Sequence, residues 1–173
     1  MEIAWEGDYF TVVRSDEGYE AIDENDIVIA LPRLDGEYII RLEKCPPYEA
    51  KDRGDNDRFY TMISGTVEDG ETPLQTLRRE MGEETPIRPS RIKLFDRKEK
   101  IPFTKVTTSR VSVYHFDVLE YEKTEADGDG SDLEAQSTYK RVSYEELQDL
   151  ASSSDRADFT IQYAANLAIK DDI

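Results

Sequence analysis

One helix constrains the fold most, because sequence signals specify both of its ends. Thr72-Pro73-Leu74-Gln75 supplies a capping threonine, a proline at the first helical position and a glutamine three residues after the cap. An apolar stripe that can pack against a sheet is formed by Leu74, Leu77 and Met81. Pro86 disfavours helical geometry at the residue before it. We therefore predict a helix that begins after Thr72 and ends near Glu84.

Strand patterns lie on both sides of this helix. Runs of β-branched and aromatic residues predict strands at residues 9–14, 26–31, 37–42, 59–63, 92–96, 110–121 and 139–142. Asp35-Gly36 predicts a hairpin turn between the second and third of these strands. Ser143 with Glu146 resembles a second capping box, and residues 158–170 carry apolar side chains on one helical face. This order predicts a layered α/β (α+β) fold, and the length of 173 residues predicts a single domain spanning 1–173.

Charge excludes one class of partner. The formal net charge of −17 would repel a phosphate backbone, so we expect no duplex nucleic acid partner. An anionic small-molecule substrate would need local cations to reverse this field, which favours a divalent metal.

Targeting and redox features predict a cytoplasmic protein. No apolar stretch approaches the roughly 18 residues of a membrane helix, so we expect no membrane partner. Glu2 and Glu6 stand where a signal peptide would carry cations. Cys45 is the only cysteine in the sequence, which fits a reducing compartment.

Three glutamates near the end of the predicted helix share one face. Glu80, Glu83 and Glu84 are spaced i, i+3 and i+4, where like charges cost about 0.2–0.5 kcal/mol per pair. A divalent cation with oxygen ligands would reverse this cost. Without metal, we expect neutralisation of one glutamate to stabilise the fold. The alternative is a solvated glutamate-rich helix in which Arg79 and Glu83 form an ion pair.

Residues 65–87 resemble the Nudix box, G-x5-E-x7-R-E-U-x-E-E-x-G-U, in which U is a bulky aliphatic residue. Eight of the nine specified positions match: Gly65, Glu71, Arg79, Glu80, Met81, Glu83, Glu84 and Ile87. Pro86 stands where the pattern has glycine. The resemblance implies a Nudix fold, a mixed β-sheet sandwiched between helices. It also implies a hydrolase that splits a diphosphate linkage with the help of Mg2+ or Mn2+.

The resemblance also implies residue roles. The metal ligands would be Glu80, Glu83, Glu84 and the carbonyl of Gly65. Glu71 and Arg79 would orient these ligands. Glu83 or Glu84 would act as the general base, and Glu134 in the acidic loop is a further candidate. His115, the only histidine, lies in a strand pattern and is expected to be a packed side chain rather than a base.

The substrate class follows from a partial likeness within the family. Residues 38–47 resemble the corresponding strand of ADP-ribose pyrophosphatases, but Cys45 replaces their arginine, Thr61 a glutamate and Ser64 an alanine. ADP-ribose or a related nucleotide sugar is the leading substrate, and family analogy suggests a homodimer. Nucleoside triphosphates, dinucleoside polyphosphates and RNA caps are alternatives. An alternative of another class is a non-catalytic Nudix module that senses a nucleotide.

Overall fold

The structure, a computed structural model, describes residues 1–7, 11–44, 58–104, 106–126, 137–153 and 157–168. The strands are β1 (Glu2–Glu6), β2 (Thr11–Arg14), β3 (Glu20–Asp23), β4 (Ile27–Leu34), β5 (Glu37–Lys44), β6 (Arg58–Thr61), β7 (Ile63–Thr66), β8 (Ile87–Pro102), β9 (Arg110–Lys123) and β10 (Thr138–Val142). The helices are α1 (Pro73–Glu84), α2 (Tyr144–Ala151) and α3 (Phe159–Leu167). Among the described residues, no helix is long and apolar enough to cross a membrane.

The main sheet is mixed and is built around β4. Within the described ranges it has seven strands, in the order β10-β5-β4-β9-β8, with β6 paired to β5 and β7 paired to β4. The β4–β9 pair is parallel, from Ile27 opposite Val111 to Arg33 opposite Asp117. The pairs that β4 forms with β5 and β7 are antiparallel. Nearly all of β4 is buried, which is expected of a central strand whose sheet is covered on both faces.

The predicted hairpin turn is confirmed. Asp35 and Gly36 have φ angles of 52° and 82°, and both lie in the left-handed region. A two-residue hairpin turn with a twist that matches its strands needs positive φ at both positions, which explains the Asp-Gly pair. The turn sets the register in which Arg33 pairs with Tyr38.

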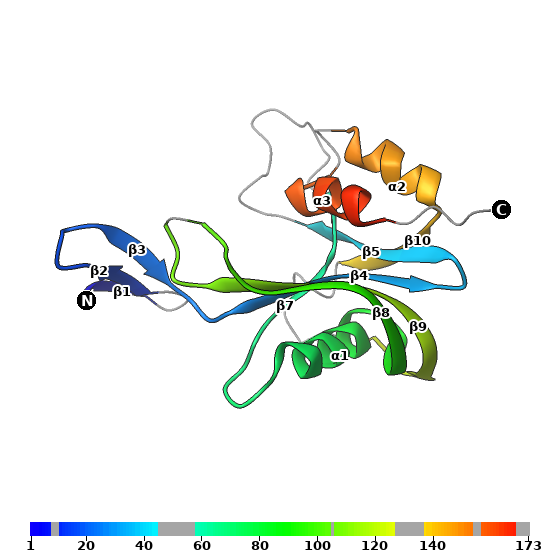
Figure 1. Ribbon diagram of the computed structural model, residues 1–173, viewed down its shortest axis with the longest axis horizontal. Coiled ribbons are helices and arrows are strands. Elements are labelled where there is room, and N and C mark those ends of the chain that lie inside the picture. The colour runs from blue at the N-terminus through cyan, green and yellow to red at the C-terminus, as the bar shows by residue number, and fades with distance from the viewer. Residues whose placement is uncertain (8–10, 45–57, 105, 127–136, 154–156, 169–173) are drawn as a thin grey trace.

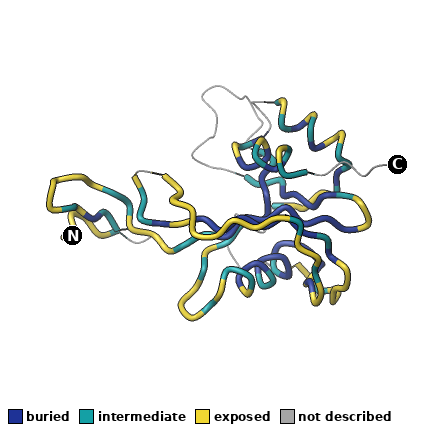
Figure 2. Tube along the Cα trace, in the orientation of Figure 1, coloured by how far each residue is buried: buried dark blue, intermediate teal, exposed yellow. Residues whose placement is uncertain are grey.

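Helices cover both faces of the main sheet, as Figure 1 shows: α1 lies on one face and α2 with α3 on the other. Two buried clusters fill the two layers (Figure 2). Leu77 and Met81 of α1 belong to one cluster, and Leu147 and Ile161 of the other helices belong to the second. The predicted fold, a mixed sheet between helices, is confirmed.

The ends of the helices follow the predicted signals. Thr72 caps α1 in a capping box with Gln75, and α1 ends at Glu84 because Thr85 is extended. Ser143 and Glu146 form the second predicted capping box, at the start of α2. Helix α3 is shorter than the predicted 158–170: Asp158 is its N-cap, Ala168 is already extended, and residues 169–170 lie outside the described ranges.

Some strands differ from the predicted ones. The run predicted at residues 59–63 forms two strands, β6 and β7, which pair with different neighbours. Strand β8 extends well beyond residues 92–96, because it pairs with β9 almost throughout despite its bulges and charged side chains. The register around Pro89 and Arg91 shifts, which is how a proline-containing edge strand keeps its pairing.

A second, smaller sheet at the N-terminus was not predicted as a separate unit. Strands β1, β2 and β3 form an antiparallel sheet that extends to one side of the main sheet (Figure 1). Strand β3 contacts the connection between β8 and β9: the Ile22 N–H donates to the Val106 carbonyl at 2.8 Å, and the Thr108 N–H donates to the Ile22 carbonyl at 2.9 Å. The two sheets are therefore joined by backbone hydrogen bonds as well as by the chain. Whether residues 1–173 form one folding unit stays a prediction.

Candidate active site

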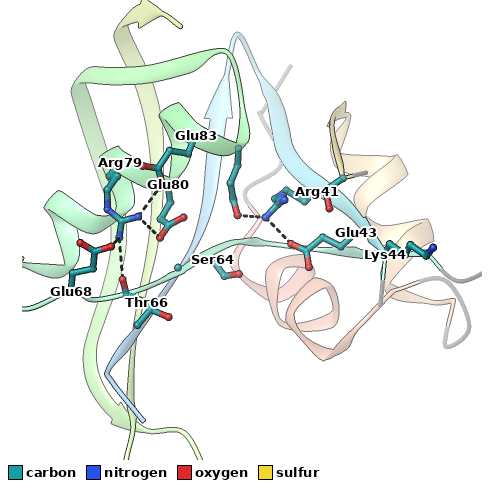
Figure 3. A pocket seen from close by; sticks show the side chains of 12 residues that line it. Arg41, Glu43, Lys44, Ser64, Thr66, Glu68, Arg79, Glu80 and Glu83 are labelled. Carbon is teal, nitrogen blue, oxygen red and sulfur yellow. Dashed lines mark hydrogen bonds and ion pairs between the residues drawn. The ribbon is translucent and has the colours of Figure 1, made fainter. Parts of the chain in front are cut away.

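A cavity of about 420 Å3 lies where α1, β5 and β7 meet. Its lining residues are Arg41, Glu43, Lys44, Ser64, Gly65, Thr66, Glu68, Arg79, Glu80, Glu83, Glu84 and Ser137. All the predicted metal ligands line it, from Gly65 on β7 and from the C-terminal half of α1. Figure 3 shows the α1 side chains on one side of this cavity and those of β5 on the other. The fold thus gathers carboxylates and cations from two sequence regions into one polar pocket.

Gly65 is required by the close approach of Glu80. A Cβ atom at position 65 would overlap the Glu80 carboxyl group. Glu80 itself is buried, and it points from α1 toward β7, where residues 63–66 pair with β4. The glycine therefore gives the Glu80 carboxylate its place beside the backbone of β7.

Arg79 connects the carboxylates of the predicted motif. Its guanidinium contacts Glu71 at 3.1 and 3.2 Å, Glu83 at 3.0 Å and Glu80 at 2.9 Å. It also donates to the Thr66 carbonyl at 3.1 Å, which ties α1 to β7 (Figure 3). The ion pair of Arg79 with Glu83 is therefore real, but it is one part of a larger network.

Glu71 lies behind this network rather than in the cavity. Hydrogen bonds from Arg79, and then from the Thr76 hydroxyl at 2.8 Å, lower the pKa of the Glu71 carboxyl to about 2. The same Glu71 contact raises the pKa of Arg79. Both groups therefore stay ionised over the whole pH range in which the protein could work, and the ion pair persists throughout that range. This geometry fits the orienting role that the resemblance implies for both residues.

Arg41 on β5 is a site residue that the sequence reasoning missed. Its Nη1 donates to Glu84 Oε1 and lies 2.9 Å from Glu43 Oε1. The side chains of Arg41 and Glu84 are only 6% and 2% exposed, so this ion pair is buried. The available signal was the spacing of Arg41 and Glu43, which puts both on one face of a strand. The long-range packing that brings Arg41 of β5 to Glu84 of α1 was needed to interpret it.

The buried pair reverses one expectation. Neutralising a glutamate was expected to stabilise the metal-free protein by relieving repulsion. In the structure, Arg41 already compensates Glu84, and Arg79 compensates Glu80 and Glu83. Removal of the Glu84 charge would instead leave the Arg41 guanidinium buried beside one carboxylate fewer.

The donor set fits a hard divalent cation. Glu80, Glu83 and Glu84 offer carboxylate oxygens, the ligands that Mg2+ prefers, and they line one cavity with Gly65. Across the described part of the chain, however, no three His, Cys, Asp or Glu side chains are grouped closely enough to hold a metal ion. The two arginines lie between the carboxylates instead. The residues are therefore in place, and metal binding would require the arginine contacts to rearrange.

The departure from the motif at Pro86 affects the exit from α1. Thr85 is buried, and its hydroxyl donates to the Met81 carbonyl at 2.6 Å. The Pro86 carbonyl accepts a hydrogen bond from the Thr124 N–H at 3.3 Å. The chain thus passes directly from the helix into β8, and Pro86 is not among the residues that line the cavity.

Of the other residues singled out from the sequence, one lies outside the described residues and one lies away from the pocket. Glu134 lies outside the described residues, so its predicted role stays a prediction. His115 is 1% exposed and packs between Phe95 and Tyr38, with ring centroids 4.9 and 6.0 Å away. Burial, with the nearby Arg33 charge, lowers its pKa to about 4. The expectation of a packed histidine is confirmed.

Comparison with known proteins identifies the family. A family model described as the NUDIX domain matches residues 12–163, most of the chain. The chain belongs to the Nudix family and is a Nudix hydrolase. The fold is similar to a solved structure described as "Crystal structure of ADP compounds hydrolase", with a TM-score of 0.65 and 17% identity over 96% of this chain and 88% of that chain. None of the curated proteins matches the sequence significantly.

Proposed function

We propose that this protein hydrolyses a diphosphate linkage in a nucleoside diphosphate derivative with the help of Mg2+ or Mn2+, and that ADP-ribose or a related nucleotide sugar is its substrate. The observation that carries the proposal is the pocket in which Gly65, Glu80, Glu83 and Glu84 lie together with Arg41 and Arg79. The similar fold described as an ADP compounds hydrolase supports the choice of substrate class.

The residues of the pocket would have different roles in this reaction. Glu80, Glu83 and Glu84, with the Gly65 carbonyl, would hold the metal, and Glu71 and Arg79 would keep them oriented. Bound metal would neutralise the diphosphate oxygens and lower the pKa of a coordinated water. Glu83 or Glu84 would accept the proton of the attacking water. The water oxygen forms a bond to one phosphorus atom, the bond from this atom to the bridging oxygen breaks, and the leaving phosphate keeps the electron pair.

A panel of candidate substrates tests this proposal. ADP-ribose, nucleotide sugars, nucleoside triphosphates, dinucleoside polyphosphates and capped RNA are incubated with the protein in Mg2+, and products are identified by mass spectrometry. We expect AMP and ribose 5-phosphate from ADP-ribose, loss of activity in EDTA, and recovery with Mg2+ or Mn2+. Water labelled with 18O identifies the attacked phosphorus. Turnover in chelator would contradict the metal-dependent mechanism.

A second candidate function has one observation in its favour. The carboxylates are engaged by Arg79 and Arg41, and the described residues hold no ready cluster for a metal ion. A non-catalytic module that senses a nucleotide would tolerate this arrangement. Such a module would show a ligand-dependent rise in melting temperature but no products anywhere in the panel. Two further proposals, a homodimer by family analogy and a cytoplasmic location from the targeting and cysteine features of the sequence, can be tested by sedimentation and by fractionation of cells.

A further inference from the structure

The charged side chains that line the pocket do not balance, because acidic residues outnumber basic ones. Among the lining residues, five carboxylates (Glu43, Glu68, Glu80, Glu83 and Glu84) face three cations (Arg41, Lys44 and Arg79). A divalent cation would improve this balance, whereas a diphosphate would worsen it. Binding of the diphosphate therefore depends on which cations can be redirected toward it.

The two pocket arginines differ in how they are held. Arg79 is held from outside the cavity by two hydrogen bonds to Glu71, and it also donates to the carbonyl of Thr66, which lines the cavity. Among the described residues, the ion-pair partners of Arg41 are, by contrast, Glu84 and Glu43, and both line the cavity. Its buried Nε has no hydrogen-bond partner among the described residues. Among the described residues, Arg41 is therefore the arginine that is held by cavity side chains without support from outside the cavity.

Metal and Arg41 need the same carboxylate. Glu84 Oε1 accepts from Arg41 Nη1, and Glu84 is also a predicted metal ligand. A divalent cation on this carboxylate would repel a guanidinium in contact with it, because both are positive and the side chains are buried. Glu43, at 2.9 Å, would keep the displaced guanidinium within the cavity.

We propose that Arg41 is an exchangeable counter-ion: it neutralises Glu84 in the metal-free protein, is displaced from Glu84 by the metal, and then binds a phosphate oxygen of the substrate. This proposal rests on the proposed function. A guanidinium suits the second task because its planar array of donors matches a phosphate group. Arg41 thereby links metal loading to diphosphate recognition, and it makes binding ordered, with metal before substrate.

Metal binding without substrate gives the first test. Mn2+ is titrated into the wild type and Arg41→Gln, and free Mn2+ is measured by electron paramagnetic resonance. Loss of the competitor should tighten Mn2+ binding by about 5-fold or more. Arg91→Gln is the matched control, because it removes an equal charge from an exposed residue on β8 paired with Glu120. It should change Mn2+ binding less than about 2-fold.

Two further measurements separate competition from a general charge effect. In a Glu84→Gln background, Arg41→Gln should no longer tighten Mn2+ binding, because the competition is for that carboxylate. At saturating Mg2+, Arg41→Gln should bind the non-hydrolysable α,β-methylene ADP about 10-fold more weakly, the lower part of the range seen for couplings between sites. Arg41→Lys, which serves if the glutamine variant does not fold, should change both affinities in the same directions and to a smaller extent.

The outcomes are distinct. Unchanged or weaker Mn2+ binding in Arg41→Gln would overturn the proposal and show that Arg41 only positions Glu84. If the wild type still hydrolyses a diphosphate in Mg2+, the proposed function survives that result. A wild type that neither binds Mn2+ nor turns over any compound would overturn both.

Discussion

Arg79 and Glu71 form a paired contact, with Nε to Oε1 at 3.1 Å and Nη2 to Oε2 at 3.2 Å. Parallel hydrogen bonds of this kind fix the orientation of a guanidinium as well as its position. The remaining Nη1 is thereby aimed at Glu80 and Glu83, which it contacts at 2.9 and 3.0 Å. Glu71 therefore acts on the predicted metal ligands through Arg79.

Glu71→Gln should lower hydrolysis and Mn2+ affinity by about 10- to 100-fold, the range seen when a group that orients metal ligands is removed. The substituted amide keeps one acceptor oxygen but loses the charge that holds both donors of Arg79. Kinetics and Mn2+ titration measure the effect. Glu68→Gln is the control, since Glu68 is 66% exposed and lies 3.8 Å from Arg79. Equal losses of hydrolysis and Mn2+ affinity in both variants would contradict the proposal that Glu71 orients the metal ligands through Arg79.

Glu84→Gln should destabilise the metal-free protein by about 3 kcal/mol or more, because breaking a buried ion pair leaves a guanidinium poorly compensated. Urea unfolding in EDTA measures this loss. Glu83→Gln should lose less than about 1 kcal/mol, because Glu83 is 25% exposed and Arg79 retains its other partners. A stabilised Glu84→Gln protein would instead support the repulsion expected from the helix alone.

Gly65→Ala should reduce hydrolysis by about 100-fold, since a displacement on the order of 1 Å at a reacting centre can have that effect. The added methyl group overlaps the Glu80 carboxyl group and must push it away from β7. Gly82→Ala in α1 is the control: its Cβ would meet the Arg88 Nε at 2.7 Å, and that flexible side chain can move aside. Steady-state kinetics and melting curves of both variants distinguish a local effect on the site from loss of the fold.

His115 should make stability depend on pH. The unfolded chain binds a proton on this histidine below pH 6.5, whereas the folded chain binds it only below about pH 4. Its contribution to stability is therefore complete above pH 6.5 and is lost as the pH falls toward 4. The loss should be about 3 kcal/mol, set by the ratio of the two proton affinities.

His115→Phe tests this assignment, because a phenyl ring can pack between Phe95 and Tyr38 without titrating. Urea unfolding at several pH values should give a flatter profile between pH 6.5 and 4 for this variant. The neighbouring charges Arg33, Asp117 and Asp96 are the same in both proteins. Parallel profiles would show that His115 is not the source of the pH dependence.

Local signals predicted the part of the fold that depends on near neighbours. Thr72 and Gln75 cap α1 because they are three residues apart, and Asp35-Gly36 turns because two adjacent residues tolerate positive φ. The motif around Glu80 was also readable, because eight of its nine specified positions match the Nudix box. Contacts between residues far apart in the sequence could not be predicted in this way. The contact of Arg41 with Glu84 joins residues 43 positions apart, and nothing in the spacing of either segment specifies it.

Strands that carry mostly exposed, charged side chains were also poorly predicted from the sequence. Strand β8 carries exposed residues at most of its positions, so neither alternation nor an apolar run marks its length. Its pairing with β9 supplies the hydrogen bonds that stabilise it. Strand β1 is exposed throughout and has no burial pattern at all. In both cases backbone pairing, rather than side-chain burial, determines the strand.

The parallel pairing of β4 with β9 has a consequence for the order of folding. Arg33 and Asp117, which face each other in this pair, are 84 residues apart, and the whole of α1 and β7 lies between them. Closing so long a segment loses chain entropy before it gains contacts, so we expect this step to be slow. During synthesis, β4 stays without its central neighbour until β9 has left the ribosome. The sheet against which the carboxylate-bearing helix packs is thus completed only after that helix has been synthesised.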